Sequence, residues 1–172
     1  MQALASLLLS EPQMPITLSI VGNGNPSQSD TSAYRQRLQE LAALPQLKGR
    51  VRFWGAIPPE QMPDLYRQHD VLVFSSSEAE GFPLVLLEAM ASGLALVSTT
   101  VGGAAEILAD GENCLTFLPG DVTGLSSCLR RLSDDPSLRQ MLAAQGHELV
   151  ITRFGAGSQF DAVEAMIWEC VR

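Results

Sequence analysis

The sequence predicts an α/β domain in which a parallel β-sheet carries helices on both faces. Short runs of β-forming residues alternate along the chain with longer stretches of helical periodicity. Two of these runs, VLVF at 71–74 and LALV at 94–97, are apolar at every position. Continuous apolar runs are typical of central strands that are covered on both sides. No repeat or linker divides the 172 residues, a length that suits one domain.

The expected elements follow one another in a regular order. The expected strands cover residues 16–22, 50–55, 70–76, 94–100 and 114–118. The expected helices cover residues 2–10, 31–43, 60–68, 83–92, 103–109, 121–133, 136–152 and 156–171. Pro58 or Pro59 can open the third helix, because a proline at the first helical position has its φ preset. Gly93 suits the left-handed position that ends the fourth helix.

Composition and charge exclude several classes of protein. The net charge of −8, without any block of basic residues, does not favour nucleic-acid binding. The three widely spaced cysteines fit neither a disulfide framework nor a metal site, so we expect buried free thiols in a reducing compartment. The apolar run near the start has no basic segment before it and is shorter than the roughly 20 residues of a membrane span. We therefore expect no signal peptide, no transmembrane segment and a cytoplasmic location.

The stretch SSSEAEGFPLVLLEAMASG, residues 75–93, is the candidate ligand site. It follows an expected strand and leads into a helix, and open parallel sheets bind ligands where strands end and helices begin. Gly81 permits close approach of a ligand to the backbone, and Pro83 suits the first helical position. We expect the backbone N–H groups of residues 82–85 to be unpaired and to bind an anion, such as a phosphate, without a metal ion.

Two carboxylates, Glu80 and Glu88, lie at the two ends of this helix start. Helical side chains lean toward the N-terminus, so Glu88 is expected to point back toward the anion, where its two oxygens suit a vicinal diol such as ribose. Glu80 can bind a second hydroxyl-rich group in the same way. The alternative is structural: Glu80 stabilises the helix dipole and Glu88 belongs to a solvated face. The spacing alone leaves both interpretations open.

Three motifs in a fixed order give this sequence a family resemblance: EGFPLVLLE at 80–88, VGGAAEIL at 101–108 and GENCLTFLPGD at 111–121. With them, residues 1–172 resemble the C-terminal, donor-binding half of family 4 retaining glycosyltransferases of the GT-B fold. The resemblance implies a Rossmann-like domain. It also implies transfer of a sugar from a nucleotide diphosphate donor with retention of configuration. It implies no cofactor and no metal in the donor site.

The resemblance also implies roles for individual residues. Glu80 is the expected catalytic residue, in contact with the transferred sugar, and Glu88 is expected to bind the ribose hydroxyls. The backbone at four neighbouring positions is expected to face sugar and diphosphate, and two loops are expected to border the base. These further positions are Gly81, Phe82, Pro83 and Leu84 for the first group and Asn23, Gly24, Ala56 and Ile57 for the second.

The sequence departs from the family pattern at its start. The strand and the Arg and Lys phosphate clamps that open the C-terminal lobe in the family do not precede MQALASLLL, and no N-terminal lobe is present. We expect a fragment of low stability, inactive in isolation. The alternative is a non-catalytic nucleotide-sugar-binding subunit that needs a separate acceptor lobe. The expected partners are a nucleotide-sugar donor and an N-terminal lobe, or a second copy, bound through the C-terminal helix at 153–172.

The missing strand has a structural consequence. In the doubly wound strand order 3-2-1-4-5-6 the first strand is central. Without it, the strand at 16–21 must pair directly with the strand at 71–74, or leave a gap that another chain fills.

The remaining polar residues have mainly structural interpretations. We expect His69 and His147 to be structural, because no acid and nucleophile accompany them. The basic cluster LKGRVR at 47–52 can hold a phosphate or form a solvated strand edge.

Overall fold

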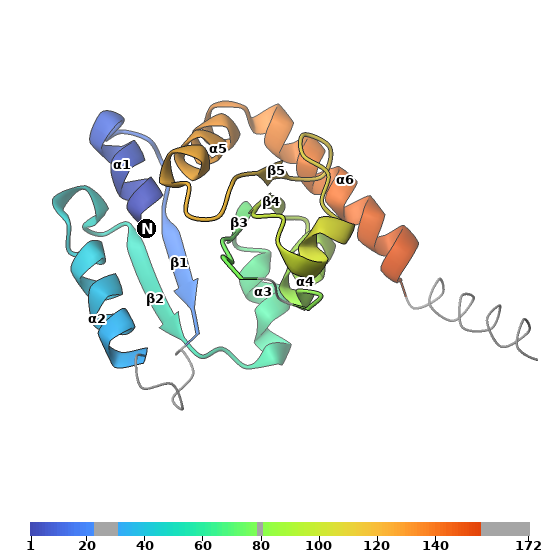
Figure 1. Ribbon diagram of the computed structural model, residues 1–172, viewed down its shortest axis with the longest axis horizontal. Coiled ribbons are helices and arrows are strands. Elements are labelled where there is room, and N and C mark those ends of the chain that lie inside the picture. The colour runs from blue at the N-terminus through green and yellow to red at the C-terminus, as the bar shows by residue number, and fades with distance from the viewer. Residues whose placement is uncertain (23–30, 79–80, 156–172) are drawn as a thin grey trace, which may run out of the picture.

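The computed structural model describes residues 1–22, 31–78 and 81–155, and its elements follow the predicted alternation (Figure 1). The strands are β1 Leu18–Val21, β2 Val51–Gly55, β3 Val71–Phe74, β4 Ala95–Ser98 and β5 Leu115–Thr116. The α-helices are α1 Gln2–Ser10, α2 Thr31–Ala42, α3 Met62–Tyr66, α4 Leu84–Ala91, α5 Val122–Asp134 and α6 Pro136–Phe154. Three short 3-10 helices complete the set: η1 Pro45–Leu47, η2 Pro59–Gln61 and η3 Gly102–Glu106.

Most predicted boundaries are confirmed to within a few residues. Gly93 has a φ of +81° directly after α4, which confirms the left-handed position. The expected helix at 103–109 is instead the 3-10 turn η3, which begins with two glycines. Pro83 is not the first helical residue of α4 but its N-cap, because its ψ of 98° is extended. The helix expected at 156–171 lies outside the described residues.

The strands form two separate parallel sheets. In one, β1 pairs with β2 in the register Leu18↔Val51. In the other, the order is β3-β4-β5, with Val71 opposite Ala95. The pairing of β1 with β3 that was the first of our two expectations is wrong. The second expectation, a gap between these strands, is what the structure shows.

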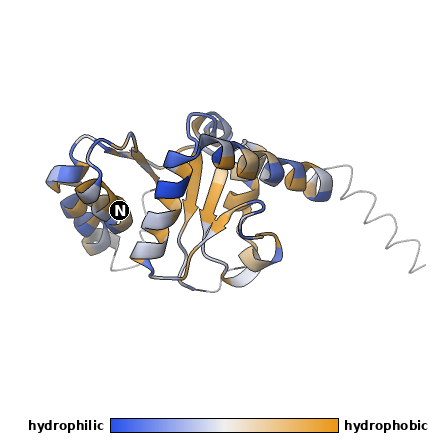
Figure 2. Ribbon diagram, turned by 90° about the horizontal axis from the view of Figure 1, so that it is seen from above, coloured by the Kyte–Doolittle hydropathy of each residue, from blue (hydrophilic) through white to orange (hydrophobic). Residues whose placement is uncertain are grey.

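Helices cover both faces of the three-stranded sheet, whose strands are strongly apolar (Figure 2). Every residue of β4 is buried. Leu96 belongs to a cluster with Leu86 and Met90 of α4, whereas its neighbour Val97 belongs to a cluster with Leu132 of α5. Because successive strand residues point to opposite faces, this division puts α4 and α5 on opposite sides of the sheet.

The smaller sheet has a core of its own. Leu4, Leu7 and Leu8 of α1 pack with Leu47 of η1, and Leu18 of β1 lies against this cluster. Helix α1 also contacts α5, and the Ser126 hydroxyl donates to the carbonyl oxygen of residue 3 at 2.7 Å. The helix layer therefore joins the two sheets, although their strands do not pair.

The described helices and cysteines bear on the expected membrane segments and disulfides. None of the helices in residues 1–22, 31–78 and 81–155 is long and apolar enough to cross a membrane. Cys114 and Cys128 are buried free thiols, as expected, and Cys170 lies outside the described residues.

Candidate functional site

The N-terminal end of α4 presents backbone donors. Pro83, its N-cap, has no side-chain acceptor, and no side chain of residues 1–22, 31–78 or 81–155 caps the helix. The N–H groups of Leu84 and Val85 have no acceptor within the described part of the chain. Such a helix end carries roughly half a positive elementary charge. Beside it, Gly81 is exposed and has nothing within 4 Å of the position that a Cβ would occupy. The helix end can therefore be approached by an anion.

The loop before α4 is seated on a glycine of η3. A Cβ built on Gly103 would lie 2.8 Å from Phe82 Cα and 3.0 Å from the carbonyl oxygen of Gly81. Both are backbone atoms, so only a residue without a side chain fits at this position. The close approach of Gly103 thus fixes how near the backbone at 81–82, which leads into α4, lies to η3.

Two further contacts hold the same loop. The Phe82 ring packs against the Phe154 ring at the end of α6, with centroids 5.7 Å apart. The hydroxyl of the buried Thr99 donates to the carbonyl oxygen of Ser76 at 2.8 Å, which ties the residues that follow β4 to those that follow β3. The helix end is therefore preorganised by its own surroundings.

Glu88 is exposed on α4, one turn beyond Leu84. Its Oε2 accepts a hydrogen bond from the hydroxyl of the buried Tyr66 on α3 at 3.0 Å. Burial, and then the bond to Glu88 and its charge, raise the pKa of Tyr66 well above its ordinary value of 10. The phenol consequently stays a neutral donor, and it holds one carboxylate oxygen while the carboxylate keeps capacity for other donors.

The other predicted site residues are distributed as follows. Glu80, Asn23 and Gly24 lie outside the described residues. Ala56 is exposed and Ile57 is half-buried, and both directly follow β2, a strand of the smaller sheet. The structure thus brings Gly81, Phe82, Pro83, Leu84 and Glu88 together around one helix start. The ligand roles of all ten positions stay predictions.

The basic cluster at 47–52 divides into two kinds of residue: Lys48 and Arg52 are exposed, as the solvated alternative expects, whereas Arg50 is half-buried. The Arg50 guanidinium donates to the carbonyl oxygens of Met14 at 2.6 Å and Pro12 at 2.9 Å. The Arg52 guanidinium stacks over the Trp54 ring, 3.5 Å from its centroid. Arg50 thus holds the segment between α1 and β1, and phosphate binding by this cluster stays a prediction.

Sequence reasoning missed Gly103, Tyr66 and Thr99. The GG pair of VGGAAEIL was a signal for Gly103, because paired glycines after a strand often mark a close backbone approach. No local signal identifies Tyr66 or Thr99, since their partners are 22 and 23 residues away. Among the described residues, His69 contacts the Leu65 carbonyl oxygen and the Ser19 hydroxyl, and His147 contacts the Met90 carbonyl oxygen.

Among the described residues, no three His, Cys, Asp or Glu side chains are grouped so that they could hold a metal ion.

Comparison with known proteins gives a consistent family. The family described as "Glycosyl transferases group 1" matches residues 1–135. A D-inositol 3-phosphate glycosyltransferase of Streptomyces avermitilis is 35% identical over 138 residues, which cover 80% of this chain and 29% of that protein. The lipopolysaccharide core biosynthesis glycosyltransferase LpsE of Rhizobium meliloti is 36% identical over 128 residues, 74% of this chain and 37% of that protein. The chain thus spans about a third of the length of these curated relatives.

Solved structures agree in fold. The C-terminal domain of a group 1 glycosyl transferase, LpcC of Francisella tularensis, has a TM-score of 0.78 at 30% identity and covers 90% of this chain and 77% of that one. Anabaena Alr3699/HepE, solved in complex with UDP, has a TM-score of 0.82 at 23% identity and covers 97% of this chain and 44% of that one. At that lower identity the likeness concerns the fold alone.

Proposed function

This chain belongs to the group 1 glycosyltransferases, and we propose that it is the donor-binding lobe for a nucleotide diphosphate sugar. In this proposal the enzyme is of the retaining type, and donor binding requires no metal ion. The acceptor and the complete transfer reaction require a second lobe, so the isolated chain binds donor without turnover.

One observation carries the proposal: the uncapped start of α4. Its N–H groups at Leu84 and Val85, which have no acceptor among the described residues, lie next to the open space at Gly81. A diphosphate placed there accepts backbone hydrogen bonds and gains from the helix dipole, and in this proposal these two contributions hold it without a metal ion. Anabaena HepE, which shares the fold, has been solved with UDP and with UDP-glucose, which supports a donor of this chemistry.

The same donors serve the chemistry. When the sugar leaves, negative charge develops on the diphosphate, and donors already fixed in place stabilise that charge without reorganisation. The contacts of Gly103 and Phe154 with the loop at 81–82 hold these donors in place. Glu80 is the proposed contact to the transferred sugar, at a position outside the described residues.

Glu88 is the proposed ribose ligand. Tyr66 holds its Oε2 at 3.0 Å, which orients the carboxylate, and a carboxylate has room for two hydroxyl donors of a vicinal diol as well. The loops that follow β1 and β2, with Asn23, Gly24, Ala56 and Ile57, are the proposed borders of the base. They include positions whose backbone shape decides between uracil, guanine and adenine.

Isothermal titration of the purified chain with UDP, GDP and ADP, with and without EDTA, tests the proposal. We expect one of them to bind equally well in EDTA. Glu88→Gln should weaken that binding by about tenfold to a hundredfold, since a hydrogen bond to a charged group contributes about 1.5–3 kcal/mol. Glu148→Gln, which changes an exposed glutamate of α6, is the matched control and should bind like the wild type. Absence of heat with every nucleotide in a folded sample contradicts the proposal.

A further inference from the structure

Tyr66 is a buried phenol whose hydroxyl group contacts the proposed ribose ligand. It is the last residue of α3 and is 7% exposed. It belongs to the core cluster that contains Leu86 and Met90 of α4, so its ring is held by packing. Its hydroxyl donates to Glu88 Oε2 at 3.0 Å, whereas Glu88 itself is exposed. A buried group therefore holds one oxygen of a carboxylate that is otherwise open to solvent.

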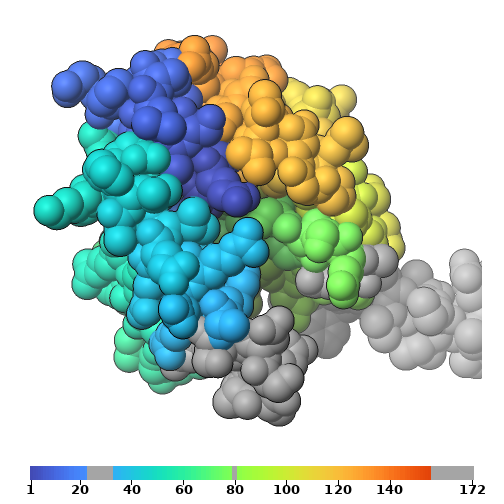
Figure 3. Space-filling model, turned by 60° about the vertical axis from the view of Figure 1, so that its left-hand side comes forward, coloured from blue at the N-terminus to red at the C-terminus, as the bar shows by residue number. Residues whose placement is uncertain are grey.

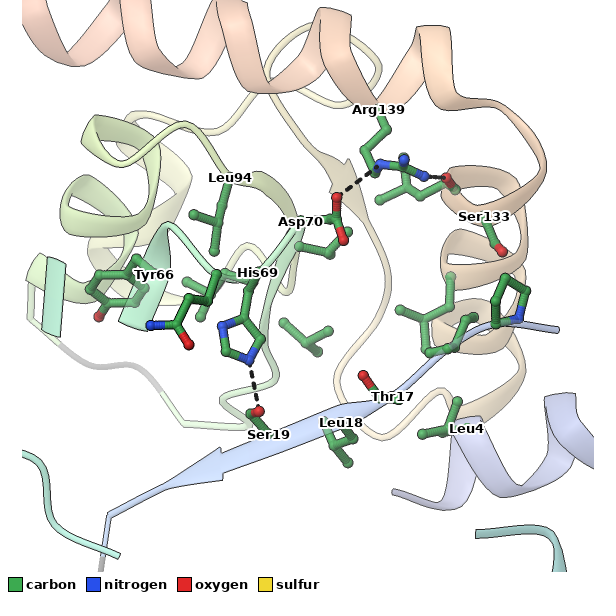
Figure 4. A pocket seen from close by; sticks show the side chains of 18 of the residues that line it. Leu4, Thr17, Leu18, Ser19, Tyr66, His69, Asp70, Leu94, Ser133 and Arg139 are labelled. Carbon is green, nitrogen blue, oxygen red and sulfur yellow. Dashed lines mark hydrogen bonds and ion pairs between the residues drawn. The ribbon is translucent and has the colours of Figure 1, made fainter. Parts of the chain in front are cut away.

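A second set of hydrogen bonds anchors the end of α3. His69 Nδ1 lies 2.7 Å from the Leu65 carbonyl oxygen, which only accepts, so Nδ1 carries the proton of the neutral ring. His69 Nε2 then accepts from the Ser19 hydroxyl of β1 at 2.7 Å. Trp54 Nε1 of β2 donates to the same Ser19 oxygen at 3.0 Å. Figure 4 shows Tyr66 and His69 on one segment, with His69 directed toward Ser19. Tyr66 is thus presented to Glu88 from a segment that is tied to the smaller sheet.

The bond from Tyr66 changes what Glu88 can select. A glutamate side chain that binds a ligand from a mobile state loses rotamer freedom, and a ligand group that is already oriented avoids most of that loss. Once Oε2 accepts from the phenol, the remaining lone pairs of the carboxylate point in set directions. Two neighbouring hydroxyls that match these directions bind better than one. A mobile carboxylate, by contrast, turns toward whichever hydroxyl is present.

We propose that Tyr66 is a positioning residue that makes Glu88 select ribonucleotides over 2′-deoxyribonucleotides. The inference rests on the proposed function, because it requires a nucleoside diphosphate whose sugar lies at Glu88. Tyr66 acts through Glu88 and not by contact with the nucleotide. The chain reaches Tyr66 from the loop after β2 through η2 and α3, so the bond also joins the segment beside the proposed base position to α4.

The test compares each nucleoside diphosphate with its 2′-deoxy form. UDP, GDP and ADP and their three 2′-deoxy counterparts are titrated calorimetrically into the chain, and the ratio of the two dissociation constants is taken for the base that binds. We expect the wild type to bind the ribose form about tenfold more tightly, the effect of one hydrogen bond to a charged group that water partly replaces.

Tyr66→Phe should reduce this ratio to about threefold or less. Phenylalanine keeps the ring that packs with α4, so the variant is expected to fold, and it lacks only the hydroxyl that orients Glu88. The ribose form should lose most of the affinity, since it is the form that uses both directions of the carboxylate. A merely structural role of Tyr66 would weaken both forms alike and leave the ratio at its wild-type value.

Two further variants complete the design. In a Glu88→Ala background, Tyr66→Phe should leave the ratio unchanged, because no carboxylate remains to be oriented. Tyr34→Phe is the matched control, since Tyr34 is 64% exposed on α2. Figure 3 shows this helix in light blue on the surface of the molecule. This control should keep the wild-type ratio.

The possible outcomes separate the inference from the function on which it rests. Suppose that a nucleotide binds and Glu88→Ala lowers the ratio. A wild-type ratio in Tyr66→Phe, or an equal effect of Tyr66→Phe with and without Glu88, then overturns the inference and leaves the proposed function standing. Equal binding of the ribose and 2′-deoxy forms by the wild type also overturns the inference. Absence of binding by every nucleotide in a folded sample overturns both.

Discussion

Adding one methyl group at Gly103 tests whether this glycine positions the loop that leads into α4. In Gly103→Ala the new Cβ would lie 2.8 Å from Phe82 Cα, whereas ordinary contacts begin at 3.4 Å. The backbone at 81–82 must therefore retreat by roughly 0.6 Å. Overpacking of this kind typically costs about 1–3 kcal/mol of unfolding free energy. Because the displaced backbone leads directly into α4, we also expect nucleoside diphosphate affinity to fall by about tenfold or more.

Gly81→Ala is the matched control for this prediction. A Cβ at Gly81 meets nothing within 4 Å, and its φ is not in the left-handed region, so the unfolding free energy should stay the same. The same Cβ projects into the space proposed for the ligand, so affinity should fall without loss of stability. Urea denaturation and isothermal titration on both variants separate the two effects. A Gly103→Ala protein with wild-type stability and affinity would refute this account of the loop.

Two further predictions concern buried groups. Thr99→Val removes the hydrogen bond to the Ser76 carbonyl oxygen and should lower the unfolding free energy by about 0.5–1.5 kcal/mol. Thr100→Val, at an exposed neighbour, should leave it unchanged, and thermal melts of both variants check this. Burial raises the pKa of the Cys114 thiol from 9.0 to about 12, so the unfolded chain loses its proton first and stability should fall as the pH rises from 9 toward 12. Urea denaturation at pH 8 and 10 checks this, and a Cys114→Ala variant that keeps the full pH dependence would contradict it.

Sequence patterns predicted the helices and strands well because buried segments have an apolar local composition. LALV at 94–97 is apolar at every position and forms β4, which is buried throughout. Gly93 could be placed because only a residue without Cβ adopts its φ of +81° at low cost. Helix α4 was likewise predicted, although Pro83 proved to be its N-cap and not its first residue.

Contacts between residues that are far apart in the sequence could not be predicted from such local patterns. The role of Arg50 depends on carbonyl groups 36 and 38 residues earlier, and Tyr66 reaches Glu88 only after α3 and α4 have packed. VLVF at 71–74 has the composition of a central strand but is half-buried, because its second neighbour is missing from the described sheet. The sequence pattern of β3 therefore predicts complete burial, whereas the strand is only half-buried in the described sheet.

The central claim is that the start of α4 binds a diphosphate through its backbone. A titration of ¹⁵N-labelled protein with the best-binding nucleoside diphosphate, followed by amide chemical shifts, tests it most directly. The account predicts the largest shifts at Gly81, Leu84 and Val85, unchanged by EDTA. Largest shifts at Val71 and Val73 of β3, with the amide signals of Leu84 and Val85 unchanged, would contradict it.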